Sequence, residues 1–245
     1  MQSFDNFLNI PIAHRGLHND KFVENSPSAF KAAIENGFGI ETDVHLLQDG
    51  VVAVFHDDNI KRVCGKDVKI ESLTSAQLKD YPMEGSGEII PTLPELLKMV
   101  DGRVPVLIEL KTLKGIVNND LARAVLRDLK AYPYKDVIAL QSFDPFAVKW
   151  LSKNQNEYPY GQLASMESHK GIPSFIDSFM GKLGCAKISR PMFIAYDIRF
   201  TPNKWIQAYL DKFFPVISWT VRTKEELQLA KDTTCNFIFE NILPD

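Results

Sequence analysis

Residues 12–57 read IAHRGLHNDKFVENSPSAFKAAIENGFGIETDVHLLQDGVVAVFHD, and three apolar runs in this stretch end in charged or imidazole side chains. His14 follows the first run, Glu41 and Asp43 close the second, and His56 follows the third. Two carboxylates separated by one residue in a strand point to the same side of it. Such a pair is costly unless a cation lies between the carboxylates. The stretch therefore indicates a catalytic site at strand ends.

The composition is that of a soluble globular protein. The 245 residues suit one large α/β barrel or two smaller domains, and 45% hydrophobic with 24% charged residues is ordinary for a full core. A formal net charge of −3 gives no electrostatic reason to expect nucleic acid as a partner. Cys64, Cys185 and Cys235 fit no metal-ligand spacing, so we expect reduced thiols.

Membrane and export signals are missing from the sequence. No apolar run approaches the ~20 residues that span a bilayer, and the start of the chain lacks the apolar run and early basic residues of a signal peptide. We therefore expect a cytoplasmic protein without stable membrane insertion, either a monomer or a small homo-oligomer.

Apolar runs alternate with helical patterns along most of the chain. Buried, nearly continuous apolar strands separated by helices favour a parallel sheet, and eight of them in this length favour a (β/α)₈ TIM barrel. The predicted strands are Ile10–His14, Phe38–Val44, Val106–Leu110, Val137–Ser142, Tyr160–Ala164, Phe193–Ile198, Val216–Val221 and Phe237–Glu240. The predicted helices are Ser28–Asn36, Asp120–Ala131, Pro145–Lys153, Phe175–Lys182, Asn203–Phe213 and Lys224–Lys231.

One segment interrupts this alternation after the second strand. Gln48-Asp49-Gly50 is typical of a hairpin turn and predicts an extra strand over Val51–Phe55. Residues 58–103 contain only short pieces, among them a helical pattern over Leu93–Val100. We interpret the chain as a single domain over residues 1–245, with residues 58–103 as a small insertion folded over the C-terminal face of the barrel.

Three carboxylates are candidates for a metal site. Glu109 ends the third predicted barrel strand, so it should lie beside Glu41 and Asp43 on the second. Three carboxylates suit a hard cation, Mg²⁺ or Ca²⁺, and disfavour zinc. The alternative is a structural network in which these acids pair with Arg15 and Lys111.

Two histidines and two basic residues complete the candidate site. His14 and His56 can act as general acid and base, because imidazole titrates near neutral pH. Arg15 and Lys111 suit phosphate oxygens, so the set indicates phosphoryl transfer. Trp219, near the end of the seventh strand, offers a flat apolar wall for a substrate or is simply a core residue.

Other polar residues carry weaker signals. We expect a supporting role for His45 and a loop position for His18. Asp197, Arg199 and Arg222 either line the pocket or pair with one another.

These motifs together resemble the glycerophosphodiester phosphodiesterase family. The resemblance covers nearly the whole chain in family order. It is carried by His14-Arg15-Gly16, Glu24-Asn25, Glu41-Thr42-Asp43-Val44, Asp49-Gly50, His56-Asp57, Ile90-Pro91-Thr92-Leu93, Ile108-Glu109-Leu110-Lys111, Ser142-Phe143 and Trp219-Thr220-Val221.

The resemblance implies a TIM barrel that hydrolyses a small-molecule glycerophosphodiester to sn-glycerol 3-phosphate and an alcohol. It implies that His14 and His56 are the catalytic pair and that Arg15 and Lys111 contact the phosphate. It further implies that Glu41, Asp43 and Glu109 bind the metal. Trp219 would then pack against the glycerol moiety.

The chain departs from the family pattern mainly in its second half. Arg222 replaces the usual Asn, and the last strand has Glu240-Asn241 in place of a Gly-rich, Asp-bearing pattern. We expect none of these departures to touch the proposed metal ligands or histidines, so they should affect substrate choice rather than the reaction. Two alternatives keep the chemistry but change the substrate or product, namely a lysophospholipase D-like activity or formation of a cyclic phosphate. A third is an inactive barrel that binds phosphodiesters.

Overall fold

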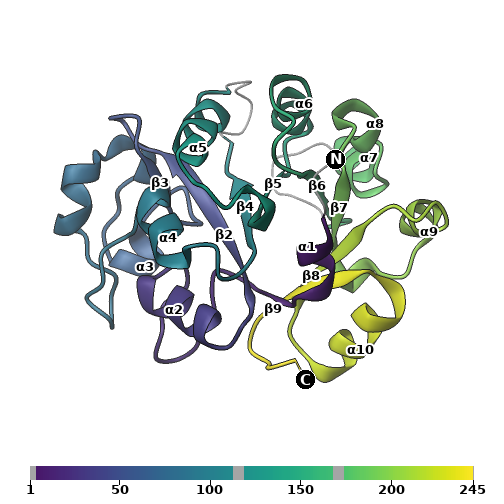
Figure 1. Ribbon diagram of the computed structural model, residues 1–245, viewed down its shortest axis with the longest axis horizontal. Helices are drawn as coiled ribbons and strands as arrows, with labels where there is room; N and C mark the ends of the chain where they lie inside the picture. Colours follow the sequence, from purple (N-terminus) through teal and green to yellow (C-terminus); the bar gives the residue numbers. More distant parts are fainter. Residues whose placement is uncertain (1–3, 113–118, 168–173, 245) are drawn as a thin grey trace.

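The computed structural model describes residues 4–112, 119–167 and 174–244, and within them eight parallel strands close into a barrel (Figure 1). Closure comes from the first strand, which pairs with both the second and the last. The barrel strands are β1 (Ile12–Ala13), β2 (Gly39–Leu46), β4 (Val106–Leu110), β5 (Ile138–Ser142), β6 (Tyr160–Ala164), β7 (Phe193–Asp197), β8 (Val216–Val221) and β9 (Asn236–Phe239). The predicted TIM barrel is confirmed.

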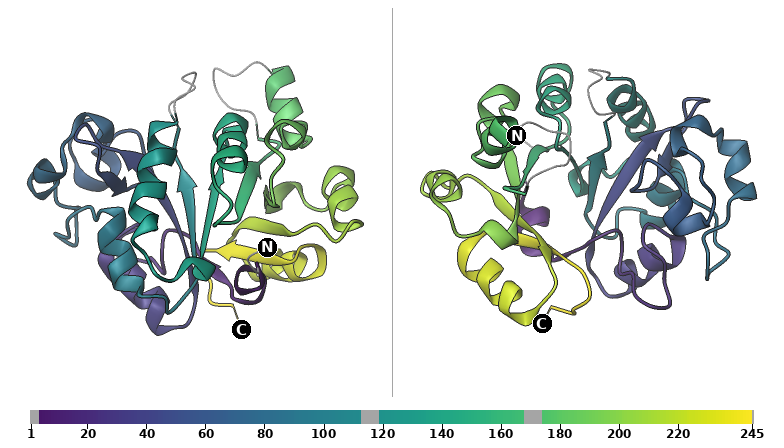
Figure 2. Two further views of the ribbon diagram at one scale, coloured as in Figure 1. Left: turned by 45° about the horizontal axis from the view of Figure 1, so that its top comes forward. Right: turned by 180° about the vertical axis from the view of Figure 1, so that it is seen from behind.

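Helices surround the barrel (Figures 1 and 2). The six helices predicted outside the insertion are present, with no end shifted by more than three residues. The surrounding helices are α2 (Pro27–Glu35), α4 (Leu93–Val100), α5 (Asp120–Lys130), α6 (Pro145–Asn154), α7 (Ser174–Gly181), α8 (Ala186–Ser189), α9 (Lys204–Leu210) and α10 (Lys224–Thr233). Among the described residues, no helix has the length and apolar character needed to cross a membrane.

The first strand is shorter than the predicted Ile10–His14. Pro11 has no N–H for the ladder, and the chain leaves the sheet at Arg15, where φ is +55°. Gly16 continues the turn with φ of +78°, and a Cβ there would lie 2.9 Å from the carbonyl carbon of Ala29. This tight turn leaves His14 at the end of the strand.

The segment after β2 forms a satellite with its own core. Strand β3 (Val52–Val54) pairs antiparallel with β2, as the hairpin turn predicts. Helix α3 (Lys61–Cys64) and two 3₁₀ turns follow, at Ile70–Ser72 and Ser75–Asp80. The buried side chains of this segment form a cluster of their own, separate from the main core. This cluster includes Phe55, Ile60, Ile70, Leu78, Met83 and Ile90.

The predicted insertion over residues 58–103 contains two parts, of which only the first belongs to the satellite. Helix α4 contacts α2 and α5, and its buried side chains belong to the main core. It therefore serves as the barrel helix between β2 and β4, and only the residues before it form the satellite. Thr92 and Glu95 cap its first turn reciprocally, which starts the helix sharply after Pro91.

The barrel interior is apolar at its centre. Helix α1 (Asp5–Asn9), which the sequence analysis did not predict, places Phe7 against this core, and Phe4 stacks on Phe193 with ring centroids 4.6 Å apart. Asn236 donates from its side chain to the carbonyls of Phe7 and Ile10. Helix α1 thus packs against the interior core of the barrel.

Candidate active site

Polar side chains gather at the carboxyl end of the barrel because the strands alternate. On β4, Leu107 lies in the interior core, so Glu109 two residues later points to the same side at the rim. On β8 the same step leads from Ile217 to Trp219. On β1, β5 and β9 it leads to His14, Gln141 and Glu240. Parallel strands bring these positions to one rim.

Glu41, Asp43 and Glu109 meet at this rim. Each offers a carboxylate oxygen, and these atoms all lie within 4.8 Å of one another. All three residues are buried, with 2%, 1% and 7% exposure. The register pairs Asp43 of β2 with Glu109 of β4, which explains their approach. A buried cluster of carboxylate oxygens suits a hard divalent cation.

Two cations of the protein partly balance this charge. Lys111 places Nζ 2.9 Å from Asp43 Oδ1 and 2.8 Å from Glu109 Oε1. The Nε atom of Arg15 lies 3.4 Å from Asp43 Oδ2. The structural pairing considered as an alternative is therefore present, and it leaves Glu41 with no ion pair to either residue among the described contacts.

The pKa values show how unevenly the charge is shared. Burial and the charges of Asp43 and Glu109 raise the pKa of Glu41 well above its usual range. Burial and Asp43 raise the pKa of Glu109. Burial would raise the pKa of Asp43, but the charges of Lys111, His56 and Arg15 together outweigh burial and hold that pKa far below its usual range. A divalent cation would add positive charge beside Glu41 and Glu109 and so stabilise their ionised forms, which burial disfavours. The acidic cluster therefore fits such an ion.

His14 and His56 line the same pocket and use their Nδ1 atoms in the same way. Nδ1 of His14 is hydrogen-bonded to Oε2 of Glu240, and Nδ1 of His56 lies 2.7 Å from Oδ1 of Asp57. Nε2 of His14 lies 4.0 Å from Glu41 Oε2. Burial lowers the pKa of both histidines. With Nδ1 donating to a carboxylate, Nε2 of each ring is left to exchange protons.

The pocket collects almost all of the predicted site residues. Its lining comprises His14, Arg15, Glu41, His56, Glu109, Lys111, Gln141, Phe143, Leu163, Trp219 and Ile238. Asp43, which is paired with Lys111, is not part of the lining. A larger depression between α2 and α4 contains none of these side chains.

Trp219 and Phe143 form an aromatic wall of the pocket. Their rings meet edge to face with centroids 5.5 Å apart. Nε1 of Trp219 and Oε1 of Gln141 are buried without a hydrogen-bond partner among the described residues. Unpaired buried polar atoms are rare in proteins, so a ligand in the pocket is the natural partner for both.

His56 is held by contacts from outside the barrel. Nε2 of the buried His45 lies 3.2 Å from the His56 carbonyl, so His45 supports the site without entering it. Arg62 of α3 donates to Asp57 from Nε at 2.7 Å and to Glu24 through both terminal nitrogens. The satellite thus ties His56 to the loop that follows β1.

We expect Arg62→Ala to destabilise the fold only above acidic pH. Arg62 and His56 oppose the effect of burial and lower the pKa of Asp57 to about 2, from 3.8; the pKa of Glu24 is also lowered. A carboxyl with a lowered folded-state pKa stabilises the fold above its unfolded pKa, and this stability is lost as the pH falls toward the folded value.

Urea denaturation at pH 5 and pH 2.5 checks this expectation. The difference in free energy of unfolding between wild type and Arg62→Ala should shrink at the lower pH. Lys61→Ala, which removes a neighbouring exposed cation, should show no such change. A pH-independent difference for Arg62→Ala would contradict the role of the carboxylates.

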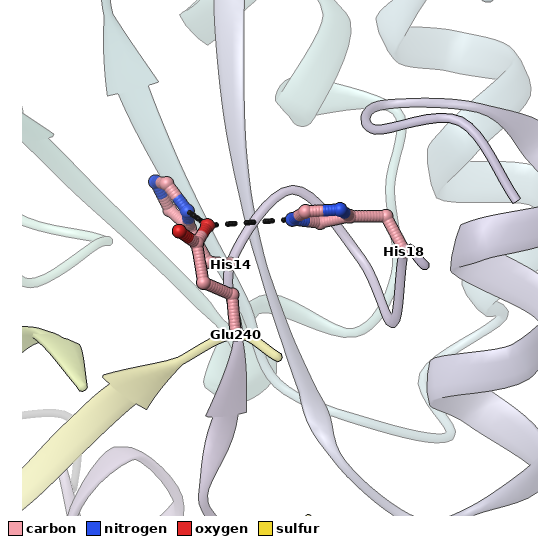
Figure 3. A group of neighbouring side chains, drawn as sticks. All are labelled: His14, His18 and Glu240. Carbon is pink, nitrogen blue, oxygen red and sulfur yellow. Dashed lines mark hydrogen bonds and ion pairs between the residues drawn. The ribbon is translucent and has the colours of Figure 1, made fainter. Parts of the chain in front are cut away.

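We expected that the residues of the last strand that depart from the family pattern would not touch the histidines, and this expectation was wrong. Glu240 follows β9, which pairs with β1, so its carboxylate meets His14 (Figure 3). His18 lies in a loop as expected, but its Nε2 is 3.3 Å from the same Glu240 oxygen. Arg222 donates from Nε to Glu240 Oε1 at 2.6 Å. The two histidine contacts span 226 and 222 positions of the sequence, which no local pattern covers.

Asp197 and Arg199 pair with each other instead of lining the pocket. Arg199 donates from Nε to Oδ1 of Asp197 at 3.0 Å and also reaches Glu167. Asp197 also accepts a hydrogen bond from Ser165 at 2.8 Å, which stabilises the rim beside β6 and β7.

Known proteins with related sequences point to one family. A glycerophosphodiester phosphodiesterase of Caldanaerobacter subterraneus is 29% identical over 150 residues, covering 58% of this chain and 61% of that protein. A human lysophospholipase D is 32% identical over 139 residues, covering 51% of this chain and 42% of that protein. The aligned part is therefore less than two thirds of either relative.

A solved structure and a family profile cover more of the chain. A phosphodiesterase of Oleispira antarctica, solved with the product sn-glycerol-3-phosphate, is 24% identical with a TM-score of 0.81, covering 98% of this chain and 95% of that one. The profile of the Glycerophosphoryl diester phosphodiesterase family matches residues 14–241. This match includes every strand end of the pocket, and the chain belongs to the glycerophosphoryl diester phosphodiesterase family.

Proposed function

We propose that the chain hydrolyses glycerophosphodiesters to sn-glycerol 3-phosphate and an alcohol, with Mg²⁺ or Ca²⁺ held by Glu41, Asp43 and Glu109. The observation that supports this most strongly is the shared pocket. Two histidines, two basic residues and carboxylates of the acidic cluster line it together. The bound cation would polarise the phosphate and offset its negative charge.

The chain's own residues would do the rest of the chemistry. Arg15 and Lys111 would bind the phosphate oxygens and stabilise charge that develops on them. Nε2 of one histidine accepts the proton of the attacking group, while Nε2 of the other donates a proton to the departing alcohol oxygen. The aromatic wall of Trp219 and Phe143 would pack against the glycerol carbons.

A lysophospholipid is a second candidate substrate, supported by the apolar surface of α7. Phe175 and Phe179 are 73% and 47% exposed, and Ile176 is 37% exposed. A Cβ at Gly181, the last residue of α7, would meet Ser165 and Met166 just after β6. The helix therefore lies beyond the carboxyl end of the barrel (Figure 2), where an acyl chain leaving the pocket could contact it. The human relative's name points to the same class.

One assay tests both substrates. Purified chain would be incubated with glycerophosphocholine or lysophosphatidylcholine, with Mg²⁺ or Ca²⁺ and with or without EDTA, while choline release is followed. Cleavage of glycerophosphocholine that EDTA abolishes supports the first proposal. Cleavage of lysophosphatidylcholine that Phe175→Ser lowers, while glycerophosphocholine cleavage is unchanged, supports the second. No release from either diester with either cation would refute the enzymatic proposal.

A further inference from the structure

We propose a second cation site, selective for Zn²⁺, formed by His14, His18 and Glu240. Each of these residues offers one ligand atom, and the three atoms lie within 4.8 Å of one another. They come from three segments, namely the end of β1, the loop after it, and the residue following β9 (Figure 3). The carboxylate cluster of Glu41, Asp43 and Glu109 shares none of them.

The two imidazoles are aimed at a common point. Nδ1 of His14 and Nε2 of His18 both contact Oε2 of Glu240, the latter at 3.3 Å (Figure 3). Ring nitrogens direct their lone pairs in the ring plane, so two nitrogens that share one partner atom can share one metal ion. A small rotation of the Glu240 carboxylate would make room for the ion and keep an oxygen as its third ligand.

The donor set selects the metal. An established coordination of Zn²⁺ consists of two imidazole nitrogens, one carboxylate oxygen and a water in the fourth position. Imidazole is a poor ligand for Mg²⁺ and Ca²⁺, which prefer oxygen. The side chains of His14, His18 and Glu240 are 13%, 18% and 12% exposed, so they are ordered by packing yet reachable by an ion and a water.

Glu240 is oriented from its other side. Arg222 donates from Nε to Oε1 of Glu240 at 2.6 Å, which leaves Oε2 directed at the histidines. Hydrogen bonds of this kind fix ligand orientation in metal sites. The two departures from the family pattern, Arg222 and Glu240, thus act together.

Zinc at this site would inhibit the enzyme, a consequence that rests on the proposed function of His14. A neutral imidazole bound through Nδ1 carries its proton on Nε2, and it cannot become imidazolium while the metal is bound. Nε2 of His14 lies on the side of Glu41, at 4.0 Å from its Oε2. Zinc on one edge of the ring would therefore stop proton exchange on the other edge.

Equilibrium dialysis against Zn²⁺ in excess Mg²⁺ tests the site without relying on activity. Wild type is expected to bind one more zinc ion per chain than His18→Gln. His18→Cys, which restores a zinc ligand, should regain that ion. Equal zinc content in wild type and His18→Gln would overturn the proposal, whether or not the chain hydrolyses any diester.

The rate of glycerophosphocholine hydrolysis tests the inhibition. Without zinc, His18→Gln should match wild type, since His18 does not line the pocket. Half-inhibition of His18→Gln should require at least about tenfold more Zn²⁺, because loss of even an outer partner weakens metal sites 10–100-fold. Equal inhibition of both proteins would show that zinc acts elsewhere, for example on the carboxylate cluster, and would overturn the inhibitory role.

Discussion

Glutamine in place of Glu109 is expected to lower kcat for glycerophosphocholine by about three orders of magnitude, since cation stabilisation contributes several kcal/mol to the barrier. The substitution keeps the size of the side chain and removes one of three buried ligands of the cluster. Lys111 would keep its contact with Asp43 at 2.9 Å, so the rest of the site should stay in place.

Stability and metal affinity separate this effect from misfolding. Burial already raises the pKa of Glu109, so a neutral side chain should not lower the melting temperature of the metal-free protein. Mg²⁺ or Ca²⁺ binding, followed by calorimetry, should weaken. Glu95→Gln is a matched control, because glutamine also completes the capping box of α4. A Glu109→Gln enzyme with wild-type kcat and metal affinity would refute the ligand assignment.

Replacing His14 or His56 by alanine is expected to lower kcat by about 10²–10⁴-fold, the usual contribution of general acid–base catalysis. Both rings line the pocket and present Nε2, since Nδ1 is engaged by Glu240 or Asp57. Affinity for Mg²⁺ or Ca²⁺ should change little in either variant, because neither ring belongs to the carboxylate cluster.

Steady-state kinetics with saturating cation measures this. The double variant should lose little more than the more impaired single variant, because groups that act in one proton-transfer step are not additive. His18→Gln serves as the control for loss of a neighbouring imidazole. Near wild-type kcat in both alanine variants would exclude the histidine pair.

Local pattern was enough to predict the barrel and the position of its acids. The apolar runs of β4 and β8 matched the predicted limits without a change. Alternation placed Glu41, Asp43 and Glu109 on one side of neighbouring strands, and the structure brings their oxygens together. The roles of these residues stay predictions until activity is measured.

The sequence pattern did not predict the structure correctly where the position of a helix depends on the elements it packs against. Helix α4 has a strongly amphipathic sequence, but nothing local says whether its apolar side faces the satellite or the barrel. The contacts of α4 with α2 and α5 show that α4 belongs to the helices around the barrel. Helix α1 was missed because only five residues are helical, and Phe7 is buried by the barrel rather than by a helical pattern of its own.

The sequence by itself determined the strand periodicity and the family motifs, because both depend on residues close together in the chain. Only the tertiary structure decided what surrounds His14. Closure of β9 against β1 brings Glu240 to its Nδ1 across 226 positions, and the loop after β1 returns His18 to the same oxygen. Hydrogen bonds between such distant residues follow from barrel closure, which no local pattern encodes.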